Sequence, residues 1–149
     1  MALQHEYLNN NGTVAFLGLS RSGKGYGWDV LNSVRSYTPI TKIIAVHPCA
    51  TRDEMKGLET VHLAEQIKPT PGLAIVVLKP KDAYNAIEGL AAAGIKKVWL
   101  VMAACSKDNR EYAEKQGMEV VGGCPILFVE EPAFPHSFHR ALAKLFGKI

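Results

Sequence analysis

The sequence predicts a single α/β domain of three layers, with a doubly wound parallel sheet between two layers of helices. Apolar strand-like segments alternate with helix-like segments along the chain of 149 residues. Such alternation is typical of parallel sheets whose helices form right-handed crossovers on both faces. A glycine-rich turn joins the first strand-like segment to the first helix-like segment, which is the usual connection in a first βα unit.

We expect five strands, each an apolar segment bounded by turn residues. The segments are 13–19, 42–46, 73–78, 97–102 and 119–121. Segment 73–78 is a continuous apolar run, as expected of a strand that is buried on both faces. We predict the strand order 3-2-1-4-5, which places 73–78 outside 42–46 and places 97–102 beside 13–19. A ligand crevice is then expected at the carboxyl ends of 13–19 and 97–102, where the order reverses.

Helices are expected between these strands, where apolar residues recur at helical spacing. Pro80 is suited to the first turn of a helix, and Gly94 is suited to its end. The expected helices begin near Tyr26, span Thr60–Gln66, run from Pro80 to Gly94, and span Lys107–Gln116. The domain, residues 1–149, also includes a short helix at 2–10 and a helical extension at about 132–149.

Composition limits the classes of function. Apolar residues make up 48% and charged residues 21%, as in an ordinary globular protein. The net charge of +3 is too small to indicate nucleic-acid binding, although a mildly basic surface favours a polyanionic small molecule. No apolar run approaches the ~20 residues of a membrane span, and the first residues do not resemble a signal peptide. Three cysteines without a framework spacing fit a reducing cytoplasm, so we expect a cytoplasmic protein.

The glycine-rich turn matches the P-loop pattern G-x-x-x-x-G-K-[ST] incompletely. Gly18, Gly23 and Lys24 fit the pattern, but Gly25 stands where Ser or Thr would bind Mg²⁺. No later apolar segment ends in an Asp that could bind the metal. Without these groups phosphoryl transfer lacks its metal anchor, so we do not expect a P-loop NTPase.

The same turn departs from the dinucleotide-binding fingerprint G-x-G-x-x-G. Ser20 replaces the middle glycine of this fingerprint. In dinucleotide-binding proteins that glycine lets the pyrophosphate approach the backbone. Segment 42–46 ends in His47-Pro48, whereas a nicotinamide site usually has a carboxylate there for the ribose hydroxyls. NAD(P) therefore stays an alternative ligand and not the first choice.

A third pattern combines Gly18-Leu19-Ser20-Arg21 after the first strand with Val46-His47-Pro48 after the second. Further along, Gly94–Leu100 enters a strand, and Gly117–Val121 leads to Cys124-Pro125. These motifs, in this order over about residues 12–126, resemble the CoA-binding domain family. That family is the Rossmann-like module at the start of succinyl-CoA synthetase α subunits and in small stand-alone bacterial proteins.

The resemblance implies that the chain binds CoA or acyl-CoA. The loop from Gly18 to Gly25 and the N-terminus of the next helix are expected to hold the pyrophosphate. Loops after the second and third strands would flank the adenosine end. The expected binding residues are Gly18, Leu19, Ser20, Arg21, Ser22, Lys24, Gly25, His47, Pro48, Arg52, Leu78, Lys79, Pro80 and Met102.

The chain departs from the family pattern at two strand ends. His47 replaces the usual Asn, and Met102-Ala103-Ala104-Cys105 replaces a glycine-containing turn. Both lie where the crevice is expected, so the identity of the ligand stays open. For the charged candidates Lys24 and Arg52, a solvated surface position is the alternative to a phosphate contact.

Cysteines and histidines offer other chemistry. Cys105 precedes an expected helix N-terminus, a setting that can activate a thiol, although a buried structural role is more common for a cysteine. Cys124 follows the last expected strand. His136 and His139 are three residues apart, but no third metal ligand is evident nearby, so we expect no metal site. No carboxylate is spaced to pair with a histidine or a nucleophile, and we expect no catalytic residue.

We therefore expect a CoA or acyl-CoA binding protein, non-catalytic or regulatory, rather than an enzyme. An NAD(P)-dependent oxidoreductase, an acyl-transfer enzyme that uses Cys105, and a subunit of an acyl-CoA ligase are the alternatives. The expected partner is a nucleotide-like small molecule, with neither nucleic acid nor membrane. A homodimer formed by the last helix, with Phe138 and Phe146 on one face, stays open.

Overall fold

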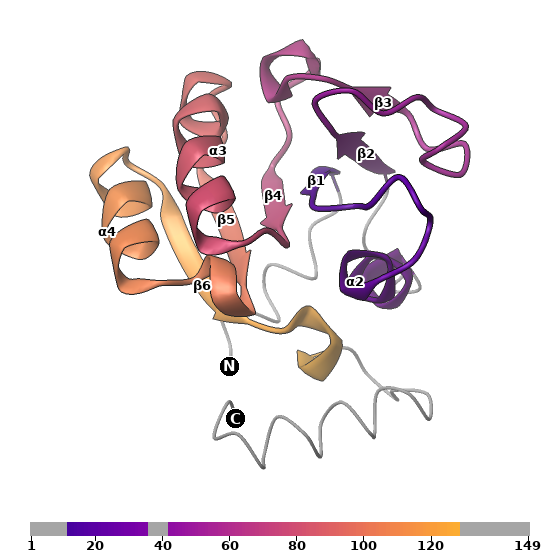
Figure 1. Ribbon diagram of the computed structural model, residues 1–149. Helices are drawn as coiled ribbons and strands as arrows, with labels where there is room; N and C mark the ends of the chain where they lie inside the picture. The colour runs from indigo at the N-terminus through magenta and orange to yellow at the C-terminus, as the bar shows by residue number, and fades with distance from the viewer. Residues whose placement is uncertain (1–11, 36–41, 129–149) are drawn as a thin grey trace.

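A six-stranded parallel sheet forms the centre of the computed structural model, which describes residues 12–35 and 42–128 (Figure 1). The strand order is β3-β2-β1-β4-β5-β6, and every pair of neighbours is parallel. The strands are β1 (Thr13–Leu17), β2 (Lys42–Val46), β3 (Thr60–Val61), β4 (Leu73–Val76), β5 (Lys97–Val101) and β6 (Glu119–Gly123). The predicted doubly wound, Rossmann-like α/β class is therefore confirmed.

Helices cover both faces of the sheet and complete the three layers (Figure 1). The α-helices are α2 (Tyr26–Arg35), α3 (Pro80–Ala92) and α4 (Lys107–Lys115), and the 3₁₀ helices are η1 (Ala64–Gln66), η2 (Met102–Ala104) and η3 (Pro125–Phe128). One core packs α2 and η3 against the sheet, and the other packs α3 and α4 against the opposite face. Every strand except the two-residue β3 serves both cores by alternation: Phe16 belongs to the first and Leu17 to the second.

The position of one strand differs from the prediction. The run that begins at Leu73 was expected outside β2, but β4 pairs with β1 in the middle of the sheet. Its residues are all buried, which fits a central strand better than an edge strand. The strand order therefore reverses between β1 and β4, not between β1 and β5, and the crevice moves with it.

The prediction of a helix over Thr60–Gln66 was wrong in its first half. Thr60 and Val61 instead form the edge strand β3, in register with Ala45 and Val46. The side-chain oxygen of Gln66 accepts hydrogen bonds from the backbone N–H groups of His62 and Leu63, at 2.9 Å each. These bonds cap the N-terminus of η1, which spans only Ala64–Gln66.

The other expected boundaries agree closely with the structure. Pro80 is the first residue of α3, and Gly94 follows that helix with a positive φ of 84°. The expected helices at 2–10 and 132–149, and the pair His136 and His139, lie outside the described residues. Within residues 12–35 and 42–128, no helix is long and apolar enough to cross a membrane.

Candidate functional site

The turn after β1 is held against β4 and α2 by two glycines. Gly18 has a φ of +113°, and a Cβ at this position would lie 2.0 Å from the carbonyl oxygen of Val77. A Cβ on Gly27, in the first turn of α2, would lie 2.3 Å from the carbonyl oxygen of Gly18. The close approach of three backbone segments therefore requires glycine at both positions.

Ser20 organises the rest of this turn. Its carbonyl oxygen accepts hydrogen bonds from the Gly23 N–H, at 3.2 Å, and from the Trp28 indole N–H, at 2.9 Å. Its hydroxyl donates to the carbonyl oxygen of Lys24 and lies 2.8 Å from the Ser22 hydroxyl. The loop is thus preformed, and the expected contact of Ser20 and Ser22 with phosphate stays a prediction.

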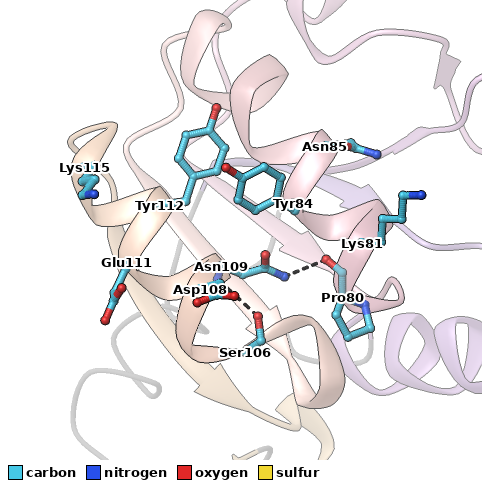
Figure 2. Close-up of a pocket in the computed structure, with 10 residues that line it drawn as sticks. All are labelled: Pro80, Lys81, Tyr84, Asn85, Ser106, Asp108, Asn109, Glu111, Tyr112 and Lys115. Carbon is cyan, nitrogen blue, oxygen red and sulfur yellow. Dashed lines mark hydrogen bonds between the residues drawn. The ribbon is translucent and has the colours of Figure 1, made fainter.

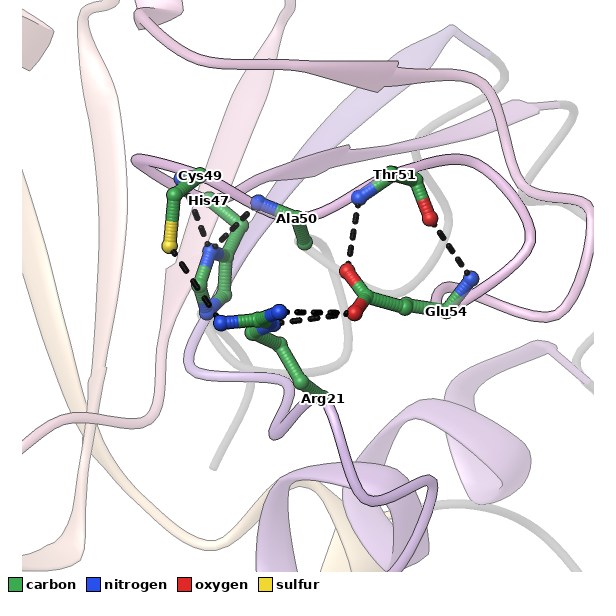
Figure 3. A network of polar contacts seen from close by, with 6 residues as sticks. All are labelled: Arg21, His47, Cys49, Ala50, Thr51 and Glu54. Carbon is green, nitrogen blue, oxygen red and sulfur yellow. Dashed lines mark hydrogen bonds and ion pairs between the residues drawn. The ribbon is translucent and has the colours of Figure 1, made fainter.

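Arg21 is paired with a residue from another loop (Figure 3). Its Nε and Nη2 lie 3.1 and 2.8 Å from Oε1 of Glu54, and Nη1 lies 3.9 Å from the sulfur of Cys49. The hydrogen bond from Arg21 is the main reason that the pKa of Glu54 falls from 4.5 to about 2, and the same bond raises the pKa of Arg21. A phosphate at this loop would therefore compete with Glu54 for the guanidinium.

Glu54 belongs to a single helical turn after β2. Its Oε2 accepts from the Thr51 N–H at 2.9 Å, and its own N–H donates to the Thr51 hydroxyl at 3.2 Å, which is a capping box. In the same turn, Nε of Arg52 donates to the carbonyl oxygen of Gly57 at 2.9 Å. The expected contact of Arg52 with a 3′-phosphate remains untested.

His47 shapes the start of this loop. Its Nδ1 accepts hydrogen bonds from the backbone N–H groups of Cys49, at 3.2 Å, and Ala50, at 3.0 Å (Figure 3). The side-chain oxygen of an Asn accepts from the N–H two residues later in an Asx turn, so His47 supplies the same acceptor. Because Nδ1 accepts, the ring proton lies on Nε2 in this arrangement.

The sequence interpretation missed a cation beside the glycine-rich loop. Nζ of Lys56 lies 4.4 Å from the centre of the Trp28 ring, a cation–π contact. A Cβ on Gly23 would lie 3.0 Å from Cε of Lys56, so this side chain crosses directly under the loop. No spacing in the sequence indicates the contact, because it joins the loop after β2 to the helix α2.

A cleft of about 620 Å³ opens at the carboxyl ends of β1 and β2, beside α3 and η1. We call it the strand-end cleft. Its walls are mainly apolar, with a few polar side chains, which is the usual composition of small-molecule sites. It is lined by Leu17, Gly18, Leu19, Ser20, Val46, His47, Pro48, His62, Leu63, Ala64, Glu65, Leu78, Asp82, Asn85, Ala86, Gly89 and Leu90.

The strand-end cleft brings together six of the expected binding residues, namely Gly18, Leu19, Ser20, His47, Pro48 and Leu78. Those that are not among its lining residues are Arg21, Ser22, Lys24, Gly25, Arg52, Lys79, Pro80 and Met102. Met102 was expected at the crevice because β5 was expected beside β1. It instead packs against the core on the α2 side of the sheet.

Gly89 keeps part of the cleft open. It lies inside α3 and lines the cleft, and a Cβ there would meet only Oε1 of Glu65, at 3.5 Å. That is an ordinary contact distance, so packing does not require glycine. A glycine inside a helix costs about 1 kcal/mol relative to alanine. The lack of a side chain at Gly89 leaves space in the cleft.

The two cysteines considered for chemistry do not line this cleft. The sulfur of Cys105 lies 3.4 Å from Nη2 of Arg110. The buried Cys124 lies 2.7 Å from the hydroxyl of Tyr26, whose pKa is raised mainly by burial. In the part of the chain that the structure describes, no three His, Cys, Asp or Glu side chains form a metal-binding group.

Comparisons with known proteins identify the family and the fold. The family model of the CoA binding domain matches residues 12–130. A conserved hypothetical protein from Pyrococcus furiosus is 25% identical, with a TM-score of 0.62 over 74% of this chain and 91% of that chain. A hypothetical protein from Pyrococcus horikoshii is 17% identical, with a TM-score of 0.67 over 83% of this chain and 84% of that chain.

A similar domain occurs within a larger enzyme. The dinucleotide-forming acetyl-coenzyme A synthetase 1 of Ca. Korarchaeum cryptofilum is 21% identical, with a TM-score of 0.66. The match covers 79% of this chain but only 27% of the synthetase, so at this identity it shows a shared fold. No functionally curated protein matches the chain.

Proposed function

The chain belongs to the CoA-binding domain family, and we propose that its strand-end cleft binds CoA or an acyl-CoA. The observation that carries this proposal is the position of the cleft, at the carboxyl ends of β1 and β2 and beside the glycine-rich turn. Ligands of open α/β sheets bind at this edge, next to the point where the strand order reverses. The reversal lies between β1 and β4, whose ends meet at Gly18 and Val77.

The chemistry of the cleft suits the adenosine end of CoA. Leucine, alanine and proline side chains supply apolar surfaces for a planar base, and Leu63 is 60% exposed at one side. Glu65 and Asp82 also line the cleft, and their carboxylates would repel phosphate but accept hydrogen bonds from an amine or a hydroxyl. We therefore place the base and ribose in the cleft and the phosphates toward the glycine-rich turn.

Three cations surround that turn and support this orientation. Arg21 and Lys24 belong to the turn itself, and Lys56 crosses under it on the Trp28 ring. Charge-assisted hydrogen bonds to phosphate are among the stronger polar interactions in proteins. The pyrophosphate is therefore expected over residues 20–25, near the N-terminus of α2, where the helix dipole also favours an anion.

We further propose that the protein acts by binding and not by catalysis. The cleft is lined by one hydroxyl, that of Ser20, which donates to the carbonyl oxygen of Lys24. Of the two histidines in the lining, His47 uses Nδ1 to accept two backbone N–H groups. Among the described lining residues, these contacts pair no nucleophile with a general base, which favours a carrier or regulatory role.

The test is calorimetric titration of the purified protein with CoA, acetyl-CoA, NAD, NADP and ATP. A Gly89→Phe variant places a ring in the strand-end cleft, and Ala92→Phe places the same ring on an exposed position of α3. We expect CoA to bind the wild type and Ala92→Phe alike, and to bind Gly89→Phe at least about tenfold more weakly. Binding of NAD or NADP alone would overturn the proposal, as would equal CoA affinity in both variants.

A further inference from the structure

A second cavity lies between α3 and α4, and nothing in the proposed function uses it (Figure 2). Its volume is about 640 Å³, within the range of small-molecule sites. Asn85 is the one residue that lines both this cavity and the strand-end cleft. We call it the α3–α4 cavity.

Asn109 presents a fixed acceptor at the floor of this cavity. The residue is 2% exposed, and its Nδ2 donates to the carbonyl oxygens of Pro80 and Ala104, both at 2.9 Å. These two bonds fix the orientation of the amide, so Oδ1 must lie on the side that faces Tyr84 (Figure 2). No residue within 12–35 and 42–128 donates to Oδ1. Buried side-chain oxygens almost always have a donor, so this one is placed to accept a hydrogen bond from a group that enters the cavity.

A ring surface lies above this acceptor. Tyr84 and Tyr112 stack with their centroids 4.5 Å apart and their planes at 26°. Tyr84 remains 45% exposed although it is a large side chain, while Tyr112 supports it from α4. A stacked partner restricts the motion of the exposed ring, so less entropy is lost when a planar ligand covers it.

The charges around the cavity balance. Lys81 and Lys115 are the cations of the lining, and Asp108 and Glu111 are its carboxylates. A site for phosphate would show an excess of cations, because anion recognition depends on them. The balanced rim, the ring surface and the buried acceptor of Asn109 together favour a neutral, planar group.

We propose that the α3–α4 cavity is a second binding site, for a neutral heteroaromatic ring with an N–H donor, of the purine or pyrimidine class. The ring stacks on Tyr84, and its N–H donates to Oδ1 of Asn109. Aromatic stacking combined with hydrogen bonds to base edges is the general means by which proteins hold unpaired bases. The inference does not rest on CoA binding, because the two cavities share only Asn85.

The test titrates the full chain with adenosine, guanosine, cytidine and uridine and follows the NMR signals of the Tyr84 and Tyr112 rings. At least one nucleoside should bind and shift both rings. Its derivative with every base N–H replaced by N-methyl should bind about tenfold more weakly, because the donor to Asn109 is lost. This comparison changes the ligand and leaves the fold of the protein intact.

Two variants locate the site. Tyr84→Ala should weaken nucleoside binding about tenfold, and Tyr84→Phe, which keeps the ring, should stay within about twofold of the wild type. Absence of binding by all four nucleosides would overturn the assignment, as would equal affinity of the methylated derivative. Binding that Gly89→Phe abolishes and Tyr84→Ala does not would place the nucleoside in the strand-end cleft and also overturn it.

Discussion

Arg21 in the loop after β1 and Glu54 in the turn after β2 form an ion pair, with Nη2 of Arg21 2.8 Å from Oε1 of Glu54. The pair joins the two loops that border the strand-end cleft. Arg21 keeps 55% of its side chain exposed, so the guanidinium can exchange partners without leaving a buried charge. Glu54 therefore competes with any phosphate that approaches the glycine-rich turn.

Changing either member of this pair should change CoA affinity in opposite directions. Glu54→Gln removes the competing charge and should tighten CoA binding about two- to fivefold. Arg21→Glu should weaken it about tenfold, because it repels the phosphates. Calorimetry measures both, with Arg35→Glu, the same charge change at the far end of α2, as the control. Unchanged affinity in Arg21→Glu would show that the phosphates lie elsewhere.

The Glu54 carboxylate should also make stability depend on pH. Its pKa in the folded protein is about 2, below the ordinary 4.5, so the unfolded chain takes up the proton first as the pH falls. The stabilisation by Glu54 is present above a pH of about 4.5 and is lost as the pH falls toward about 2. Urea unfolding should show a difference between wild type and Glu54→Gln that shrinks across this window. A constant difference would contradict the assignment.

Gly18 should tolerate no side chain. Gly18→Ala places a Cβ 2.0 Å from the Val77 carbonyl oxygen and should lower the free energy of unfolding by about 3 kcal/mol or more. Gly57 has a φ of +85° but open space around its Cβ position, so Gly57→Ala should cost only about 1 kcal/mol. Denaturant unfolding measures both. Similar losses would mean that backbone conformation, and not the contact with β4, determines the requirement.

The imidazole of His47 should be replaceable by an amide. His47→Ala removes the acceptor for the Cys49 and Ala50 N–H groups and should cost about 1 kcal/mol of stability. His47→Asn supplies an equivalent oxygen acceptor and should keep stability and CoA affinity close to those of the wild type. Thermal unfolding with and without CoA tests this. A defect of His47→Asn equal to that of His47→Ala would show that the imidazole has a role beyond accepting these bonds.

Local pattern was sufficient to predict most of the elements. Alternating apolar and helical segments predicted the α/β class, and Pro80 and Gly94 marked the two ends of α3 because their effects on the backbone are local. The glycine-rich turn and the Val46-His47-Pro48 segment indicated the edge of the sheet where the cleft opens. These features depend on residues close together in the chain.

The sequence alone determined the class of the fold and the location of the glycine-rich loop, since both follow from short-range spacing. Only the tertiary structure decided that β4 lies beside β1. The strand outside β2 is β3, and its two residues are too few to show the period of a strand in the sequence. It also decided that Arg21 pairs with Glu54, that Lys56 lies on Trp28, and that the Asn109 oxygen faces a cavity. These contacts join separate segments of the chain, so no local pattern carries them.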